Sequence, residues 1–483
     1  MITFLCGLAF LLVGGLIYGR VVERVFKPTD AETPAIKRND GVDFVPMKKW
    51  KNSLVELLNI AGTGPILGPI QGILFGPIAF ITIPIGCVIA GAFHDFMIGM
   101  ISVRHDGAQT PKLVGRFLGK YFHAIYMFFV CLTLLLVGVV FIYTPGDIFV
   151  SQVLDEGSSA ANPMLWVVYG VIFLYFIIAT LLPIDKVIGR IYPIFGAILL
   201  ISAVGVFIGL FTNNYPLVEI WNASATTFPL KGNFIPLFFV TVACGICSGF
   251  HSTQVTLVSR TITNEHEGRT TFYDMMLLEG FIAMIWAAAG MGALQSGLTD
   301  ADTLYNFPAQ VVGIVSKDML GSVGGFIAII GIIVLPITSG DTALRSLRLI
   351  LGDAVNLDQT KKKNALILAL IIFSVTGGLL IWSKTNPEGF HILWQYFSWT
   401  NEVIAVFSFA FITIYMKQHK LPYILSLLPG CFYMYTVSAY ILNAHIGLNL
   451  SWTATYIIAG VITLIFALAL MLYNNKPKEL KTA

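Results

Sequence analysis

The sequence predicts an all-α polytopic membrane protein that crosses the bilayer about thirteen times. Of its 483 residues, 56% are hydrophobic and only 11% are charged, whereas average soluble domains contain about 25% charged residues. The apolar residues form segments of about 20 residues, the length that an α-helix needs to cross the hydrocarbon core. Glycine-rich stretches interrupt some of these segments, and a broken helix at membrane depth is tolerated only inside protein or beside a cavity.

The apolar segments predict the individual helices in chain order. The first segment lacks a basic start and a small-residue cleavage site, so it is interpreted as a true span rather than a signal peptide. The expected spans are 2–19, 54–73, 76–100, 121–143, 163–183, 187–211, 235–258, 275–296, 322–343, 364–383, 391–415, 421–444 and 452–473.

The positive charges predict the orientation of these spans. The loop from Arg20 to Lys51 is rich in Lys and Arg and is therefore expected to be cytoplasmic. If the spans then alternate, only Lys231, Lys317 and Lys384 of the 29 Lys and Arg residues fall on the outer side. We therefore expect the N-terminus outside and the tail 474–483 in the cytoplasm.

The order of the spans predicts an internal repeat. The five spans in 54–211 begin on the cytoplasmic side, the five in 235–415 begin on the outer side, and each set opens with a broken helix. Such a 5+5 inverted repeat, with discontinuous first helices that meet near the midplane, is typical of secondary transporters. The remaining parts are then an extra N-terminal helix (1–20), a basic loop (21–53) and two additional C-terminal helices (421–473).

The first break has the sequence Asn-Ile-Ala-Gly-Thr-Gly-Pro over residues 59–65. A half-helix that begins after it presents free N–H groups and a positive dipole end, which suits a carboxylate. Carbonyl groups of the preceding half can coordinate a cation. The alternative is a proline kink that packs against a neighbouring helix. The predicted substrate contacts are Asn59, Gly62, Thr63 and Gly64, and Ala61 is assigned to the coupling ion.

The second break lies at 243–251 and adds Ser248, His251 and Gln254 to the predicted substrate contacts. A histidine beside hydroxyl and amide groups can donate to a carboxylate or carry a proton. The alternative is a histidine whose hydrogen bonds are satisfied within the bundle. Cys244 and Cys247 have the spacing of a redox or metal pair, although small residues at a helix break also account for them.

A third break is expected at 335–341, where Thr338, Ser339, Asp341 and Thr342 cluster. Their oxygens, with carbonyls from the first break, predict a sodium site. Asp341 is either a coupling carboxylate or is neutralised by Arg345, which lies four residues later on the same helix face, or by Arg348.

Other ionisable residues inside the spans suggest gates or proton relays. His94 and Asp95 predict such a role, or else a structural pair with Arg104 or Arg116. Glu402 lies in mid-span, where a carboxylate is costly unless it is paired or functional.

Glu279 lies about one turn inside its span, near Asp274. This position predicts a carboxylate at the membrane interface, with a proton role as the alternative.

Four motifs, in order, resemble the carbon starvation protein (CstA) family: Asn59 to Pro69, His94-Asp95-Phe96, Ser248 to Gln254, and Thr338 to Arg345. The resemblance covers about residues 48–355. It implies secondary transport of pyruvate or short peptides, and the 5+5 fold of the amino acid–polyamine–cation carriers. In that superfamily a sodium ion lies between the first and eighth core helices, and 322–343 is the eighth here.

These observations predict a secondary active transporter, an ion-coupled symporter that imports a small organic solute across a cell inner membrane by alternating access. The solute and the lipid bilayer are its expected partners, with no nucleic acid and no cofactor beyond Na⁺ or H⁺. The alternative is a proton-coupled carrier that uses Asp341, Glu402 or His251. A channel or a membrane sensor is a further rival. The chain has no Walker or His-Glu-x-x-His sequence, so no enzyme activity is expected.

Overall fold

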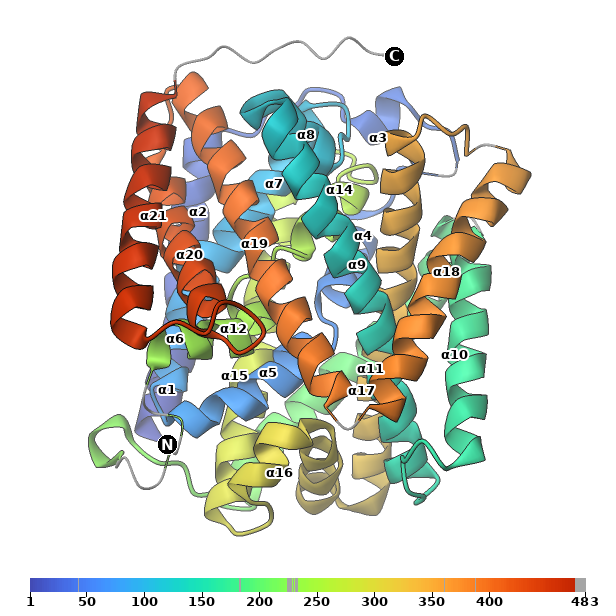
Figure 1. The fold of residues 1–483 in the computed structure, drawn as a ribbon, viewed down its shortest axis with the longest axis vertical. Coiled ribbons are helices and arrows are strands. Elements are labelled where there is room, and N and C mark those ends of the chain that lie inside the picture. The colour runs from blue at the N-terminus through green and yellow to red at the C-terminus, as the bar shows by residue number, and fades with distance from the viewer. Residues whose placement is uncertain are drawn as a thin grey trace.

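A computed structural model describes residues 1–473 except 42, 182–183, 224–227, 229, 231–232, 360 and 387. The described chain forms one bundle of helices (Figure 1) and contains no β-strand. The expected cytoplasmic tail 474–483 lies outside the described residues, as do Lys231 and the side chains of 181, 184–193 and 362.

The helices follow one another with short connections. Before residue 213 they are α1 (Ile2–Ala9), α2 (Gly15–Phe26), α3 (Pro34–Lys37), α4 (Lys49–Ile60), α5 (Gly64–Gly72), α6 (Ala79–Gly86), α7 (Ala92–Arg104), α8 (Thr110–Leu118), α9 (Lys120–Ile148), α10 (Pro163–Leu181) and α11 (Ile184–Thr212). After residue 233 they are α12 (Phe234–Thr241), α13 (Ala243–Ile246), α14 (His251–Val258), α15 (Asp274–Gln295), α16 (Ala301–Asn306), α17 (Pro308–Ala354), α18 (Lys362–Thr385), α19 (Gly389–Gln418), α20 (Ile424–Asn443) and α21 (Trp452–Leu472). A π-helical turn joins α1 to α2, and another joins α6 to α7.

Within the described residues, 11 helices are long and apolar enough to cross a membrane, or 12 if α4 and α5 form one bent span. The further span expected at 235–258 consists of the three short helices α12, α13 and α14. The prediction of about thirteen spans therefore counts two broken segments with the continuous helices. The division into inverted repeats and the side that faces the cytoplasm stay predictions.

Burial separates central helices from peripheral ones. In the most apolar stretch of α19, 89% of the residues are buried, against 17% in α21 and 33% in α18. Large apolar side chains on the outer helices, such as Val171, Ile201 and Leu464, are exposed. In a membrane protein such side chains face lipid, so polar groups on the central helices are removed from both water and lipid.

The break expected at 335–341 is wrong, because α17 continues through it and Pro336 lies inside the helix. One proline removes a single backbone donor, and neighbouring groups in a membrane bundle can compensate for that loss. The backbone departs from helical geometry at Gly321, whose φ of 67° is readily adopted only by glycine. The helix therefore starts earlier and ends later than the expected 322–343.

Candidate functional site

The two broken segments contact each other through glycines. The first break bends the chain by 49° between α4 and α5. A Cβ atom placed on Gly64 would lie 2.3 Å from Cβ of Cys244, and one on Gly68 would lie 2.7 Å from the carbonyl oxygen of Thr241. Because both distances are shorter than a van der Waals contact, α5 approaches α12 and α13 only with glycine at these positions.

The second break is held by the side chain of Asn401, which projects from α19. Cys247 is extended, with φ −161° and ψ 117°, so the helix stops after α13. Asn401 Oδ1 accepts hydrogen bonds from the Phe250 N–H at 2.6 Å and from Ser248 Oγ at 3.1 Å. The predicted substrate contact Ser248 is thus bonded to α19 and supports the broken backbone.

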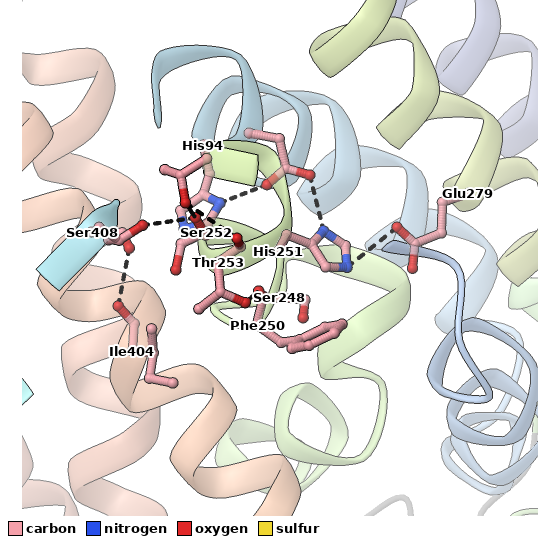
Figure 2. A network of polar contacts seen from close by, with 12 residues as sticks. His94, Ser248, Phe250, His251, Ser252, Thr253, Glu279, Ile404 and Ser408 are labelled. Carbon is pink, nitrogen blue, oxygen red and sulfur yellow. Dashed lines mark hydrogen bonds and ion pairs between the residues drawn. The ribbon is translucent and has the colours of Figure 1, made fainter. Parts of the chain in front are cut away.

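A chain of ion pairs lies directly after the second break. Asp95 on α7 is 2.7 Å from His94 Nδ1 through Oδ1 and 2.9 Å from His251 Nδ1 through Oδ2. The other ring nitrogen of His251 is 3.5 Å from Glu279 Oε2 on α15, and Figure 2 shows the ring turned toward this carboxylate. All four side chains are fully buried, so His251 bridges two carboxylates away from water.

Glu56 on α4 completes this group. Its side chain is fully buried, and neither carboxylate oxygen has a hydrogen-bond partner within the described residues. It lies close enough to Asp95 and Glu279 to interact with them electrostatically. We call these residues the acid–histidine cluster: Glu56, His94, Asp95, His251 and Glu279. Three carboxylates and two imidazoles in one buried site share protons, because unpaired charges there are costly.

A second polar group joins α17 to the end of α4. Ser339 Oγ donates to the Leu58 carbonyl at 2.9 Å, and Thr338 Oγ1 lies 3.4 Å from the same oxygen. Thr342 Oγ1 donates to the Ser339 carbonyl of its own helix at 3.0 Å. We call Thr338, Ser339 and the Leu58 carbonyl the hydroxyl cluster. Its carbonyl lies three residues before Ala61, the residue that the sequence assigned to the coupling ion.

Asp341 faces the peripheral helix α10. Its Oδ2 accepts a hydrogen bond from Tyr175 at 2.8 Å, and Arg345 donates to the Ala179 carbonyl on the same helix. Arg348 donates to Gln359. Asp341 is therefore tied to α10 by Tyr175, a residue for which the sequence gave no signal.

Several predicted site residues carry buried polar atoms that have no hydrogen-bond partner within the described part of the chain. They are Asn59 Oδ1, Thr63 Oγ1, Gln254 Oε1 and both carboxylate oxygens of Glu402. Such atoms are costly in an apolar interior unless a ligand or a proton satisfies them. A Cβ atom on Gly62 would lie 2.4 Å from the Phe141 ring, so Gly62 permits close packing at the first break.

Two expectations about ionisable residues were wrong. Asp95 does not pair with Arg104, which instead forms an ion pair with Glu265 at 2.9 Å. Glu279 is not interfacial but fully buried beside His251. The sequence analysis also missed Glu56, although it is the only carboxylate in the expected span 54–73. An ionisable residue inside a span was the signal that could have found it.

A family model described as "Carbon starvation protein CstA" matches residues 1–162 and 158–313. The chain belongs to this family. A Haemophilus influenzae protein named "Uncharacterized membrane protein" is 41% identical over 336 residues, which cover 60% of this chain and 91% of that protein.

Relatives with functional names are more distant. "Peptide transporter CstA" of Helicobacter pylori is 26% identical over 61% of this chain and 50% of its own length. "Pyruvate/proton symporter BtsT" of Escherichia coli is 26% identical over 62% and 49%, respectively. The matches thus span about half the length of these two CstA-family relatives.

The fold is similar to that of a solved transporter. A crystal structure of the Eremococcus coleocola manganese transporter matches with a TM-score of 0.57, covering 90% of this chain and 97% of the other at 12% identity. This likeness concerns the fold alone. Within the described residues, no group of three or more His, Cys, Asp or Glu side chains is arranged to hold a metal ion.

Proposed function

We propose that this CstA-family protein is a secondary active transporter that imports a small organic solute, such as pyruvate or a short peptide, together with protons. It works by alternating access in the cell inner membrane, with the N-terminus outside. The named peptide and pyruvate transporters among its relatives support the solute class. The acid–histidine cluster supports the choice of ion.

The cluster has the properties that proton coupling requires. It lies at the second break and includes Glu56 from the half-helix before the first, so its charge state acts on both discontinuous segments. His251 bridges Asp95 and Glu279 at 2.9 and 3.5 Å, so a proton added to or removed from the ring changes both contacts. Buried ionisable chains of this kind are typical of proton relays in transporters.

The solute has a place beside this cluster. Thr63 Oγ1 at the start of α5 and Gln254 Oε1 on α14 are buried without a partner in the described chain. The N-terminus of α5 offers backbone N–H groups to a carboxylate. The first break and the start of α14 therefore supply both donors and acceptors for a small carboxylic acid.

The hydroxyl cluster favours sodium as a second candidate for the coupling ion. Two hydroxyl groups and a carbonyl are oxygen ligands of the kind that bind Na⁺ in broken-helix carriers. However, both hydroxyls already use their protons to bond the Leu58 carbonyl, at 2.9 and 3.4 Å.

Uptake by proteoliposomes tests the proposal. Labelled pyruvate and labelled alanyl-alanine are supplied under an inward proton gradient or an inward sodium gradient, each imposed alone. We expect one solute to accumulate under the proton gradient and neither under sodium alone. Accumulation under sodium alone would shift the coupling to the hydroxyl cluster, and flux without accumulation under either gradient would favour a channel.

A further inference from the structure

A polar cavity lies away from both clusters, at the end of the bundle that carries α16 (Figure 1). Its volume is about 370 Å³, and its wall includes Leu67 and Gln71 of α5, the half-helix that follows the first break. The predicted topology places this end outside the cell. A cavity of this size fits a solute of a few residues and leads toward the proposed site.

One ion pair dominates the wall of this cavity. Lys384 Nζ, near the end of α18, is 2.7 Å from Asp147 Oδ2 and 3.0 Å from Oδ1 on α9. The two side chains are 6% and 18% exposed. Of the residues that line the cavity, Lys384 is the only Lys or Arg and Asp147 the only Asp or Glu.

Both partners of this pair are oriented by tyrosines. Tyr169 donates a hydrogen bond to Asp147 Oδ1. Lys384 Nζ lies 3.2 Å from Tyr143 Oη and 4.4 Å from the centre of its ring. The Tyr143 ring in turn stacks on Phe390 at 4.4 Å. Asp147 and Lys384 therefore each keep a partner if the contact between them opens.

We propose that Lys384 and Asp147 form a two-pronged docking site for a zwitterionic solute, a short peptide with free amino and carboxyl ends. The peptide carboxylate takes the place of Asp147 at Lys384, and the peptide ammonium takes the place of Lys384 at Asp147. One ion pair is exchanged for two, so no buried charge is left without a counter-charge. A monocarboxylate such as pyruvate would instead leave Asp147 uncompensated, which is costly in a buried site.

This inference rests on the proposed function only for the direction of transport, because docking is measured separately from uptake. The experiment uses the full-length purified protein and labelled alanyl-alanine. The competitors are N-acetyl-alanyl-alanine, which lacks the ammonium, alanyl-alaninamide, which lacks the carboxylate, and pyruvate. The variants are Asp147→Asn, Lys384→Gln, and the exchanged pair Asp147→Lys with Lys384→Asp.

We expect the wild-type protein to bind alanyl-alanine at least about tenfold more tightly than either blocked dipeptide, because each loses one charged contact. Asp147→Asn should remove the preference over the N-acetyl peptide but keep the preference over the amide. Lys384→Gln should do the reverse. The exchanged pair should keep both preferences, because it retains one charge of each sign.

Three results would overturn the inference. The first is wild-type protein that binds blocked and unblocked dipeptides equally or binds no dipeptide. The second is a pair of single variants that weaken all ligands to the same extent, as expected if the ion pair only fastens α9 to α18. The third is pyruvate that competes as well as alanyl-alanine. Failure of the proposed function looks different, because docking would keep the charge selectivity while no solute accumulated in proteoliposomes.

Discussion

The acid–histidine cluster and the hydroxyl cluster both lie on α4, the half-helix before the first break, yet they differ in chemistry. Glu56 brings α4 to the first cluster, which has five ionisable side chains and no exposure. Leu58 brings it to the second through a carbonyl that accepts from Ser339 at 2.9 Å. The first cluster can change its charge, whereas the second can change only its coordination.

This difference indicates which cluster a gradient can act upon. Adding a proton to Asp95 or His251 alters contacts among α7, α14 and α15, three elements that pack around the breaks. Binding a cation at the hydroxyl cluster would require Thr338 and Ser339 to rotate away from Leu58. The structure therefore favours protonation as the coupled step, and substitutions in the two clusters test that preference.

The largest effect is expected from Asp95→Asn. Asparagine keeps the size of the side chain but cannot release a proton, so both histidines lose their charged partner. Proton-driven uptake should fall on the order of a hundredfold, the scale of losing a positioned proton-transfer group. Exchange of labelled for unlabelled solute at equal pH should remain, because it needs no net proton release.

The matched control is Asp302→Asn, an exposed carboxylate on α16. It should leave uptake unchanged. Full proton-driven uptake by Asp95→Asn would remove the cluster from the coupling step, whereas loss of both uptake and exchange would indicate a structural role for Asp95.

A smaller effect is expected where the two breaks touch. Gly64→Ala places a Cβ atom 2.3 Å from Cβ of Cys244, so one helix must move. Overpacking of this kind costs about 1–3 kcal/mol, and both the melting temperature in detergent and the uptake rate should fall. Adding Cys244→Gly removes the obstructing atoms and should restore part of both.

Gly170→Ala on α10 is the matched control, because nothing lies within 4 Å of the added atom. It should leave uptake and melting temperature unchanged or slightly raise the latter. A Gly64→Ala protein as active and stable as the control would show that the contact between the breaks is not constrained.

The success of the sequence analysis depended on whether a feature is local. Both glycine-rich breaks were predictable, because glycine and proline interrupt a helix wherever they cluster in an apolar segment. Pro336 resembled a third break, but a single proline within α17 is accommodated by its neighbours. The partners of Asp95 were not predictable, since His251 lies 156 positions away in sequence. Arg104 was the nearer cation along the chain, yet it pairs with Glu265 across the bundle.

The smallest effect is expected from Ser339→Ala. The change removes the 2.9 Å hydrogen bond to the Leu58 carbonyl, and Thr338 at 3.4 Å keeps that oxygen partly satisfied. A lost hydrogen bond of this kind costs about 1 kcal/mol, so the melting temperature should fall slightly while proton-driven uptake stays within about twofold. Uptake is measured with and without sodium at constant pH, with Ser374→Ala on the exposed face of α18 as the control. If sodium stimulates the wild-type protein and Ser339→Ala alone abolishes that stimulation, the hydroxyl cluster holds the coupling ion and the preference for the acid–histidine cluster is wrong. If neither protein responds to sodium, the hydroxyls only fasten α17 to α4, and the charge changes needed for coupling belong to the acid–histidine cluster.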